Sequence, residues 1–562
     1  MRTVSRRTFG KLVGAAGAAG AAGAGAGTLL AAPAYAADGW VATGTAVAAL
    51  SSFDDTMKSF MQARGVSAGQ LAVAYNGRLV LARGYGNNSA ETIQPTSLFR
   101  IASLSKSLTA AAVLRLVQDG LIGLDDPVTS VLDFIPPTGQ SVDPRLPQVT
   151  LRRLLQHLGG WDRDLAFDPL HGRDHVIAQA LGVPLELRKE DVLRYMSGQP
   201  LQHDPGSTVA YSNYGYFLAG RVVEKVTGMS YEAYVKQKLL APLGITRMAH
   251  GKALTRLTGE VGYRSQYTGR TVLDDSGAIV PAPYGTFSMS LRDANGGWVA
   301  SAVDMVRWAT MLDGAGGVLD GASLAKVTAV PSTGVNGNGW YYGLGWAVRP
   351  FATSGGTKYN VWHTGSLAGT YTLLVKSYQG MSWAALFNQR DDPSGLSYGD
   401  IDSALWAASR QVTSWPTHNL WSTYFSPWSA VVDNTTAGRF TASTNWTVAS
   451  SLAGRYGTNY RRAAPVAASD VAWYKVNIPE TGTYRVDVWY PASTGNSAAT
   501  PYIVATSTGN KTVHVDQRSN GGKWRSLGTF TLVKGDGNKV GVSRWTSGTG
   551  YVVADAVRVT RV

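Results

Sequence analysis

The sequence predicts two folded parts: an α/β domain with strands at both ends and helices between them, followed by an all-β sandwich. Helical periodicity dominates the middle of the first 413 residues, and strand-like apolar runs come before and after it. Beyond residue 427 helical periodicity is almost absent, and alternating runs are separated by Pro, Gly and Asn turns. The 562 residues provide ample length for two or more hydrophobic cores.

The first 36 residues have the pattern of a twin-arginine export signal. Arg6 and Arg7 precede an apolar run rich in Ala and Gly from Leu12 to Ala32, and Ala34-Tyr35-Ala36 follows as a small-residue cleavage sequence. The run is only weakly hydrophobic, which favours cleavage over a membrane anchor. Because no other apolar stretch of about 18 residues occurs, we expect a secreted or cell-wall-associated protein with no membrane span after cleavage.

The α/β domain is expected to begin with two antiparallel strands over residues 69–86, because two apolar runs flank Asn76-Gly77, a strong hairpin signal. A buried helix over residues 103–119 follows, closed by Gly120. Further helical patterns occur at 149–157, 190–197, 212–227, 230–239, 302–313 and 400–412. Strand-like runs return at 341–349, 359–363, 370–377 and 382–388.

The sequence pattern changes after this domain. Residues 414–427 carry Pro416, Pro427 and several aromatic residues, and are expected to be a linker. Regularly spaced short strands then predict a β-sandwich over residues 428–562. The predicted organisation is therefore a leader at 1–36, the α/β domain at 37–413, the linker and the sandwich.

Composition excludes several kinds of site and partner. The sequence contains no Cys, which excludes disulfides, thiol catalysis and cysteine-based metal sites. The net charge is +14, but residues 428–562 carry 15 cations against 7 acids, whereas residues 37–427 are nearly balanced. This distribution argues against a nucleic-acid partner. His171 and His175 have the spacing of a helical metal pair, but Pro and Gly beside them oppose a helix, so we expect no metal or other cofactor.

Three short motifs carry candidate catalytic groups, each at the boundary of a predicted element. Ser103 and Lys106 open the buried helix, with Lys106 one turn after Ser103 on the same face. A serine becomes a nucleophile when a base takes its proton, and a helix N-terminus favours the developing anion. The second motif is Tyr211-Ser212-Asn213. Tyr211 could act as general base if nearby cations lower its pKa, and Asn213 could bind a substrate carbonyl while orienting Lys106.

The third motif lies at the edge of a predicted strand and consists of His363, Thr364, Gly365 and Ser366. Gly365 permits close backbone approach, and the Ser366 N–H could complete an oxyanion hole with that of Ser103 beside an extended substrate. His363 is expected to supply a cation or a donor. Each motif alone has a common structural explanation: a capping Ser with a surface Lys, a turn with a packed Tyr, or a structural His. Their order and positions together favour a catalytic site.

The set of motifs resembles that of the penicillin-recognising serine hydrolases, which include class C β-lactamases, DD-carboxypeptidases, D-aminopeptidases and related esterases. Supporting stretches at 120–127, 154–157 and 342–346 are similar to the same family, and the resemblance spans about residues 50–412. It implies a serine β-lactamase-like fold, an antiparallel sheet with an all-α subdomain. It also implies an acyl-enzyme formed by Ser103, deprotonated by Tyr211 with help from Lys106.

The sequence departs from true β-lactamases at two motifs. His363 stands where β-lactamases usually have Lys, and the second motif is Tyr-Ser-Asn rather than Ser-Asp-Asn. This combination resembles the secreted DD-carboxypeptidases and D-aminopeptidases more closely. The resemblance therefore implies an exported hydrolase of D-amino-acid-containing peptides or amides. A carboxylesterase on the same scaffold and a penicillin-binding protein without turnover remain alternatives.

Residues 428–562 resemble the carbohydrate-binding-like module at the C-termini of golvesin-type and xanthan-lyase-type proteins. The resemblance rests on stretches such as Val432-Asp433-Asn434-Thr435, Gly521-Gly522-Lys523-Trp524 and Ala554-Asp555-Ala556-Val557-Arg558. It implies a cell-wall polymer or polysaccharide as partner, and the net charge of +8 in this segment favours an anionic one. The alternative is a purely structural appendage whose aromatic residues fill the core.

Overall fold

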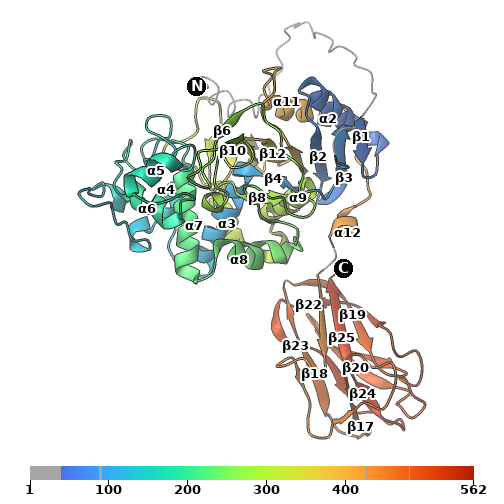
Figure 1. Ribbon diagram of the computed structural model, residues 1–562. Helices are drawn as coiled ribbons and strands as arrows, with labels where there is room; N and C mark the ends of the chain where they lie inside the picture. Colours follow the sequence, from blue (N-terminus) through green and yellow to red (C-terminus); the bar gives the residue numbers. More distant parts are fainter. Residues whose placement is uncertain (1–39, 88–90, 426–427, 480, 562) are drawn as a thin grey trace. The chain divides into compact units, whose positions relative to one another are not determined.

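The computed structural model describes residues 40–87, 91–425, 428–479 and 481–561 (Figure 1). The expected export signal at residues 1–36 lies outside the described residues. The chain divides into two compact units, Met1–Tyr424 and Phe425–Val562. Within the described ranges, no helix is long and apolar enough to cross a membrane.

The first unit is built on an eight-stranded sheet in which every neighbouring pair of strands is antiparallel. In spatial order the strands are β1 (Trp40–Thr43), β3 (Arg78–Asn87), β2 (Ala68–Tyr75), β13 (Met381–Phe387), β12 (Thr370–Lys376), β11 (Gly356–Leu367), β10 (Ala347–Thr353) and β9 (Tyr341–Tyr342). The predicted hairpin is confirmed as β2 and β3, joined at Asn76 and Gly77, which both have positive φ. Early and late strands therefore share one sheet.

Two helices that are far apart in sequence pack together on this sheet. They are α2 (Ser51–Ala63) and α11 (Asp400–Arg410). Their apolar residues, including Phe53, Met57 and Leu405, form one buried core with sheet residues such as Leu373 and Trp383. The two helices therefore cover one face of the sheet over its central strands β2, β13 and β12.

The segment between β3 and β9 forms the helical part of the first unit. It contains α3 (Ser105–Gln118), α4 (Leu151–Leu155), α5 (Asp174–Leu181), α6 (Lys189–Ser197), α7 (Asn213–Thr227), α8 (Tyr231–Val235), α9 (Ala302–Ala309) and α10 (Gly321–Val327). Most residues of α3 are buried, and α3 packs against α7. A small sheet of β4 (Phe99–Arg100), β8 (Trp298–Ala300) and β5 (Ala249–His250) leads into α3, and β6 (Thr268–Arg270) pairs with β7 (Ile279–Pro281). The predicted α/β class with an antiparallel sheet is thus confirmed.

Most of the expected linker packs on the first unit. The Trp415 ring stacks on Tyr75 at a centroid separation of 4.3 Å, and the Trp421 indole N–H donates to the Gly77 carbonyl oxygen. Trp421 opens the short helix α12 (Trp421–Tyr424). These contacts anchor residues 415–421 on the β2–β3 hairpin, a role that their proline and aromatic content did not indicate.

The second unit consists of strands, as predicted. One sheet has the order β14 (Ser429–Asp433), β25 (Ala556–Arg561), β19 (Gly482–Trp489), β22 (Arg525–Leu532). A second has the order β15 (Phe440–Thr441), β18 (Val471–Ile478), β23 (Gly535–Ser543), β20 (Thr500–Thr506), β21 (Gly509–Val515), and a third β16 (Thr447–Ala449), β17 (Tyr460–Ala463), β24 (Val552–Ala554). Alternate residues of these strands form a single apolar core.

Candidate active site

Ser103 lies in a tight 3-10 turn, Ala102–Leu104, between β4 and α3. The residue before it, Ala102, has a φ of 47°, which is unfavourable for a residue with a Cβ atom. Strained backbone of this kind is concentrated at functional sites. The Thr372 hydroxyl of β12 donates to the Ile101 carbonyl oxygen at 2.9 Å, and so ties the turn to the sheet.

Lys106 is completely buried in the first turn of α3, and its Nζ has three oxygen neighbours. Nζ lies 3.0 Å from Ser103 Oγ, 2.8 Å from Asn213 Oδ1 and 2.8 Å from the Asn295 carbonyl oxygen. Burial, reinforced by the charge of Arg163, lowers the pKa of Lys106 well below its usual value. A neutral amine can donate to the two carbonyl oxygens, which only accept, and its lone pair then faces the Ser103 hydroxyl. This geometry suits a general base.

Tyr211 also contacts Ser103, the candidate nucleophile, because its hydroxyl donates to Ser103 Oγ at 2.8 Å. Burial raises the pKa of Tyr211 to about 12, although the Arg163 guanidinium, 4.7 Å from the ring centroid, acts in the opposite direction. The condition under which Tyr211 could act as general base, a pKa lowered by nearby cations, is therefore not met, because the loss of hydration outweighs the charge of Arg163. Tyr211 is a protonated hydrogen-bond donor at neutral pH.

Asn213 is the first residue of α7 and is oriented from both ends of its amide. Its Oδ1 accepts from Lys106, and its Nδ2 donates to the Asp168 carboxylate. The helix starts here because Ser212 caps it, accepting the Gly215 N–H at 3.1 Å. The structure thus brings together Ser103, Lys106, Tyr211 and Asn213 from two helix N-termini.

The third motif lies on β11 beside the Ser103 turn. Residues 363–367 pair with β12, whereas the last β10 partner of β11 is Ala347, opposite Trp362. Among the strands described, this stretch of β11 therefore has one open edge. A side chain at Gly365 would collide with the Ile101 carbonyl and with Thr372, so glycine permits the close packing of turn and strand. Thr364 is half-buried and Ser366 is exposed on this stretch.

His363 is a neutral, enclosed residue rather than a cation. Burial lowers its pKa to about 3, and the charge of Lys106 acts in the same direction. Nδ1 lies 2.6 Å from the Thr364 carbonyl oxygen and Nε2 lies 2.7 Å from the Tyr342 hydroxyl. The neutral ring can donate at Nδ1 and accept at Nε2, so both nitrogens are occupied. Of the two roles expected for His363, the cation is wrong, whereas a neutral hydrogen-bond donor agrees with these contacts.

The sequence analysis missed the aromatic support of Tyr211. His157 has a φ of 60°, its Nδ1 accepts the Ser212 N–H at 3.1 Å, and its ring lies 4.3 Å from Tyr211 and 4.4 Å from Tyr342. Both His157 and Tyr342 occur in stretches that supported the family resemblance. Those stretches therefore contained the signal, but only the fold shows that they converge on Tyr211.

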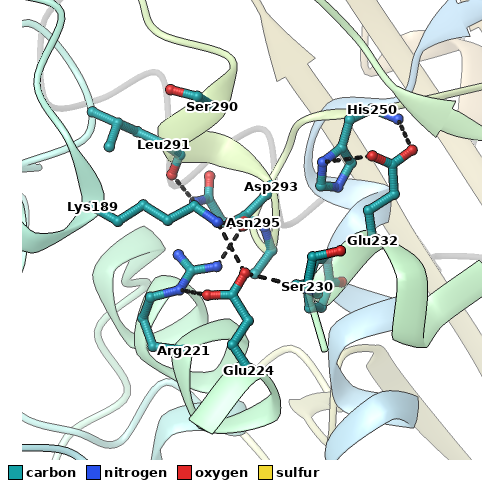
Figure 2. Close-up of polar contacts among 12 residues, drawn as sticks. Lys189, Arg221, Glu224, Ser230, Glu232, His250, Ser290, Leu291, Asp293 and Asn295 are labelled. Carbon is teal, nitrogen blue, oxygen red and sulfur yellow. Dashed lines mark hydrogen bonds and ion pairs between the residues drawn. The ribbon is translucent and has the colours of Figure 1, made fainter. Parts of the chain in front are cut away.

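A buried ion-pair network lies behind the carbonyl that binds Lys106 (Figure 2). Lys189 from α6 and Arg221 from α7 both pair with Asp293 Oδ2, with Lys189 Nζ at 2.5 Å. Asp293 lies two residues before Asn295, whose carbonyl oxygen accepts from Lys106. The network therefore anchors the segment that positions the candidate base. It could not be recognised in the sequence, because its members come from three distant segments.

Replacing Asp293 with Asn is expected to lower the free energy of unfolding by about 3 kcal/mol, because Lys189 and Arg221 lose their buried shared carboxylate and keep only the more exposed Glu224 as an ionic partner. Urea denaturation of the full chain measures this loss. The control is Asp125→Asn, which removes an exposed carboxylate 2.7 Å from Arg152 and is expected to cost less than about 1 kcal/mol. Equally small losses in the two variants would contradict an anchoring role for Asp293.

A cavity of about 150 Å³ adjoins Asn213 in the helical part. Its apolar lining includes Trp161, Phe167 and Tyr214, and its polar lining includes Asp168. The cavity is large enough for a side chain or a small acyl group. Within the described ranges, no three His, Asp or Glu side chains converge in a way that could hold a metal ion.

Curated proteins match separate parts of the chain. "Protein flp" of Staphylococcus aureus (strain COL) is 28% identical over 196 residues, which cover 34% of this chain and 36% of that protein. The chain thus spans about a third of the length of these relatives. "Xanthan lyase" of Bacillus sp. (strain GL1) is 34% identical over 137 residues, covering 24% of this chain and 15% of that protein.

Solved structures are similar to this chain in part. D-amino acid amidase from Ochrobactrum anthropi SV3, in complex with L-phenylalanine amide, is 21% identical, with a TM-score of 0.49, covering 65% of this chain and 97% of that one. A penicillin binding protein from Bacillus halodurans is 19% identical, with a TM-score of 0.46, covering 63% of this chain and 98% of that one.

Family models match both units. The Golvesin C-terminal domain matches residues 430–561, and Beta-lactamase matches residues 53–402, more than half of the chain. The resemblances found in the sequence are thereby confirmed. The chain belongs to the beta-lactamase family of serine hydrolases and carries a golvesin C-terminal domain after it.

Proposed function

We propose that the protein is an exported serine hydrolase that forms an acyl-enzyme with D-amino-acid-containing peptides or amides. The observation that carries this proposal is the position of Ser103 Oγ, within hydrogen-bond distance of both Lys106 Nζ and Tyr211 OH. A nucleophile beside a buried amine of lowered pKa is the arrangement that acyl transfer requires. The D preference rests on the Tyr-Ser-Asn and His-Thr-Gly motifs, and export rests on the leader sequence.

In the proposed mechanism the substrate lies extended along the open edge of β11. Ser103 Oγ attacks the carbonyl carbon while Lys106 accepts the hydroxyl proton. The backbone N–H groups of Ser103 and Ser366 bind the oxyanion. Tyr211 then donates its proton to the leaving amine and recovers one from Lys106, which leaves an ester on Ser103. Water attacks this ester, the acid is released, and the free hydroxyl is restored.

The cavity beside Asn213 supports a substrate with an apolar side chain on the acyl residue. Trp161, Phe167 and Tyr214 offer aromatic surface, and the Asp168 carboxylate offers a partner for a free α-ammonium group. These features favour aminoacyl amides over N-blocked substrates. They apply equally to amide and ester leaving groups, since both share the acyl part.

The substrate class is tested by measuring turnover of D- and L-phenylalanine amide, D-alanyl-D-alanine peptides and short p-nitrophenyl esters by the mature chain. We expect D-phenylalanine amide to have the highest kcat/KM, and intact-mass spectrometry after penicillin treatment to show one adduct, on Ser103. Rapid ester cleavage without amide turnover would instead establish a carboxylesterase. A stable penicillin adduct without turnover of any substrate would establish a penicillin-binding protein.

We also propose that the second unit binds a cell-wall polymer or polysaccharide and holds the enzyme close to it. The family match to a golvesin C-terminal domain and the similarity to a protein named xanthan lyase support this function. Residues 428–562 carry 15 cations and 7 acids, and this positive net charge favours an anionic polymer.

A further inference from the structure

The outer face of the sheet β14-β25-β19-β22 carries polar and aromatic side chains at regular positions. On β19, Tyr484, Val486 and Val488 are fully buried in the core of the second unit. Because successive side chains of a strand point to opposite faces, Asp487 and Trp489 lie on the other face. The register places Arg558 of β25 directly opposite Asp487, so it shares this outer face.

Three aromatic rings gather at one end of this face. Trp489, Trp524 and Tyr456 have mutual centroid separations of 5.3 to 5.5 Å, and each ring is half-buried. Trp489 is the last residue of β19, Trp524 directly precedes β22, and Tyr456 comes from the loop between β16 and β17. The Trp489 indole N–H donates to the Gly454 carbonyl oxygen at 2.8 Å, which fixes the orientation of the ring. The rings are therefore held in place and are not confined to the core.

Charged side chains continue the same face beside the rings. Asp487 Oδ2 lies 2.9 Å from Arg558 Nη2 and 3.1 Å from Arg485 Nε. The Asp487 side chain is 4% exposed, whereas those of Arg485 and Arg558 are 47% and 27% exposed. The Arg558 guanidinium also lies 4.6 Å from the centre of the Trp524 ring. One buried carboxylate thus orients two accessible guanidinium groups next to an aromatic surface.

We propose that this outer face, formed by Tyr456, Trp489, Trp524, Arg485 and Arg558, is the binding site for a carboxylate-bearing polysaccharide. The C–H faces of pyranose rings are apolar and pack on Trp and Tyr rings, whose polar edges tolerate water. Arginine side chains bind carboxylates with two parallel hydrogen bonds. The proposal rests on the proposed polymer-binding function of the second unit and identifies the surface that performs it.

The test compares binding of the full chain and its variants to alginate, to neutral dextran, and to purified cell wall with and without its teichoic acid. Trp524→Ala removes one ring, and Arg558→Gln removes one carboxylate ligand while Arg485 still neutralises Asp487. Trp524→Phe keeps an aromatic ring. The matched control is Trp545→Ala, since Trp545 is 60% exposed and lies in the loop after β23, outside this sheet face. Thermal unfolding and hydrolase activity check the fold of each variant.

We expect alginate to bind in preference to dextran, and Trp524→Ala to weaken binding about tenfold or more. Arg558→Gln should weaken binding to alginate. Trp524→Phe should lose less affinity than Trp524→Ala, and Trp545→Ala should bind alginate as tightly as the wild type. If the wild type binds alginate, and the Trp524→Ala and Arg558→Gln variants bind it equally tightly, the proposed site is wrong but the polymer-binding function stands. Equal binding of dextran, or binding only to cell wall that retains teichoic acid, would overturn a carboxylated glycan as ligand. A wild type that binds none of the polymers would refute both.

Discussion

Ser103→Ala is expected to reduce kcat by a factor on the order of a million, because the variant lacks the oxygen that becomes covalently bound to the substrate. The hydroxyl is the only atom of the residue that approaches both Lys106 and Tyr211. Steady-state kinetics with the best amide of the panel measures the loss. Intact-mass spectrometry should show no penicillin adduct in the variant.

The control for this variant is Ser105→Ala, two residues along the same segment. Ser105 is fully buried, whereas Ser103 is half-buried, and the Ser105 hydroxyl accepts only a long hydrogen bond of 3.4 Å from the Trp298 N–H among its side-chain contacts within the described residues. We expect Ser105→Ala to retain turnover close to that of the wild type. Comparable activity in Ser103→Ala and Ser105→Ala would refute the assignment of the nucleophile.

Lys106→Met is expected to lower kcat/KM by about a hundredfold to ten-thousandfold, since the variant keeps the buried volume but lacks the base. The pH dependence makes the prediction specific to proton transfer. Protonated Lys106 cannot accept the Ser103 proton, so the rate falls as the pH drops through the pKa of Lys106. Because burial lowers this pKa, we expect the acid limb of the wild-type profile well below the usual lysine range.

The acid limb should disappear in Lys106→Met, whereas replacing a lysine that does not contact Ser103 should leave the limb unchanged. Lys376→Met is the matched control, because Lys376 pairs with the exposed Asp313 at 2.7 Å. A limb that persists in Lys106→Met would assign the titration to another group. A limb at the usual lysine pKa would contradict a neutral Lys106 as the base.

The fold class could be predicted because its signals are local. Asn76-Gly77 indicated a hairpin, and the structure has that hairpin as β2 and β3. The helix expected from residue 103 begins at Ser105 as α3, so that Lys106 lies in its first turn whereas Ser103 lies in the 3-10 turn before it. Boundaries were less accurate: the single run expected at 341–349 is divided between β9 and β10, with Gly345 between them at a φ of 79°.

Protonation states and long-range support could not be read from the sequence. The pKa values of Tyr211 and His363 depend on burial, which is set by segments that lie far away in the chain. The Asn295 carbonyl that binds Lys106 is a backbone group, and any residue type could supply it. Motif reasoning therefore identified the candidate groups, but it could not decide the protonation state of Tyr211 or choose between a cation and a neutral donor at His363.

The pairing of β2 with β13 determines when during synthesis this site can form. Ala68–Tyr75 is hydrogen-bonded to Met381–Phe387, and the Ser103 turn is tied to Thr372 of β12. A ribosome must therefore translate nearly the whole first unit before Ser103 acquires its native surroundings. Contacts this distant in sequence slow folding, and the early strands expose unpaired edges in the meantime. The nascent chain therefore lacks the assembled candidate site, and remains vulnerable to aggregation, until its last central strands emerge.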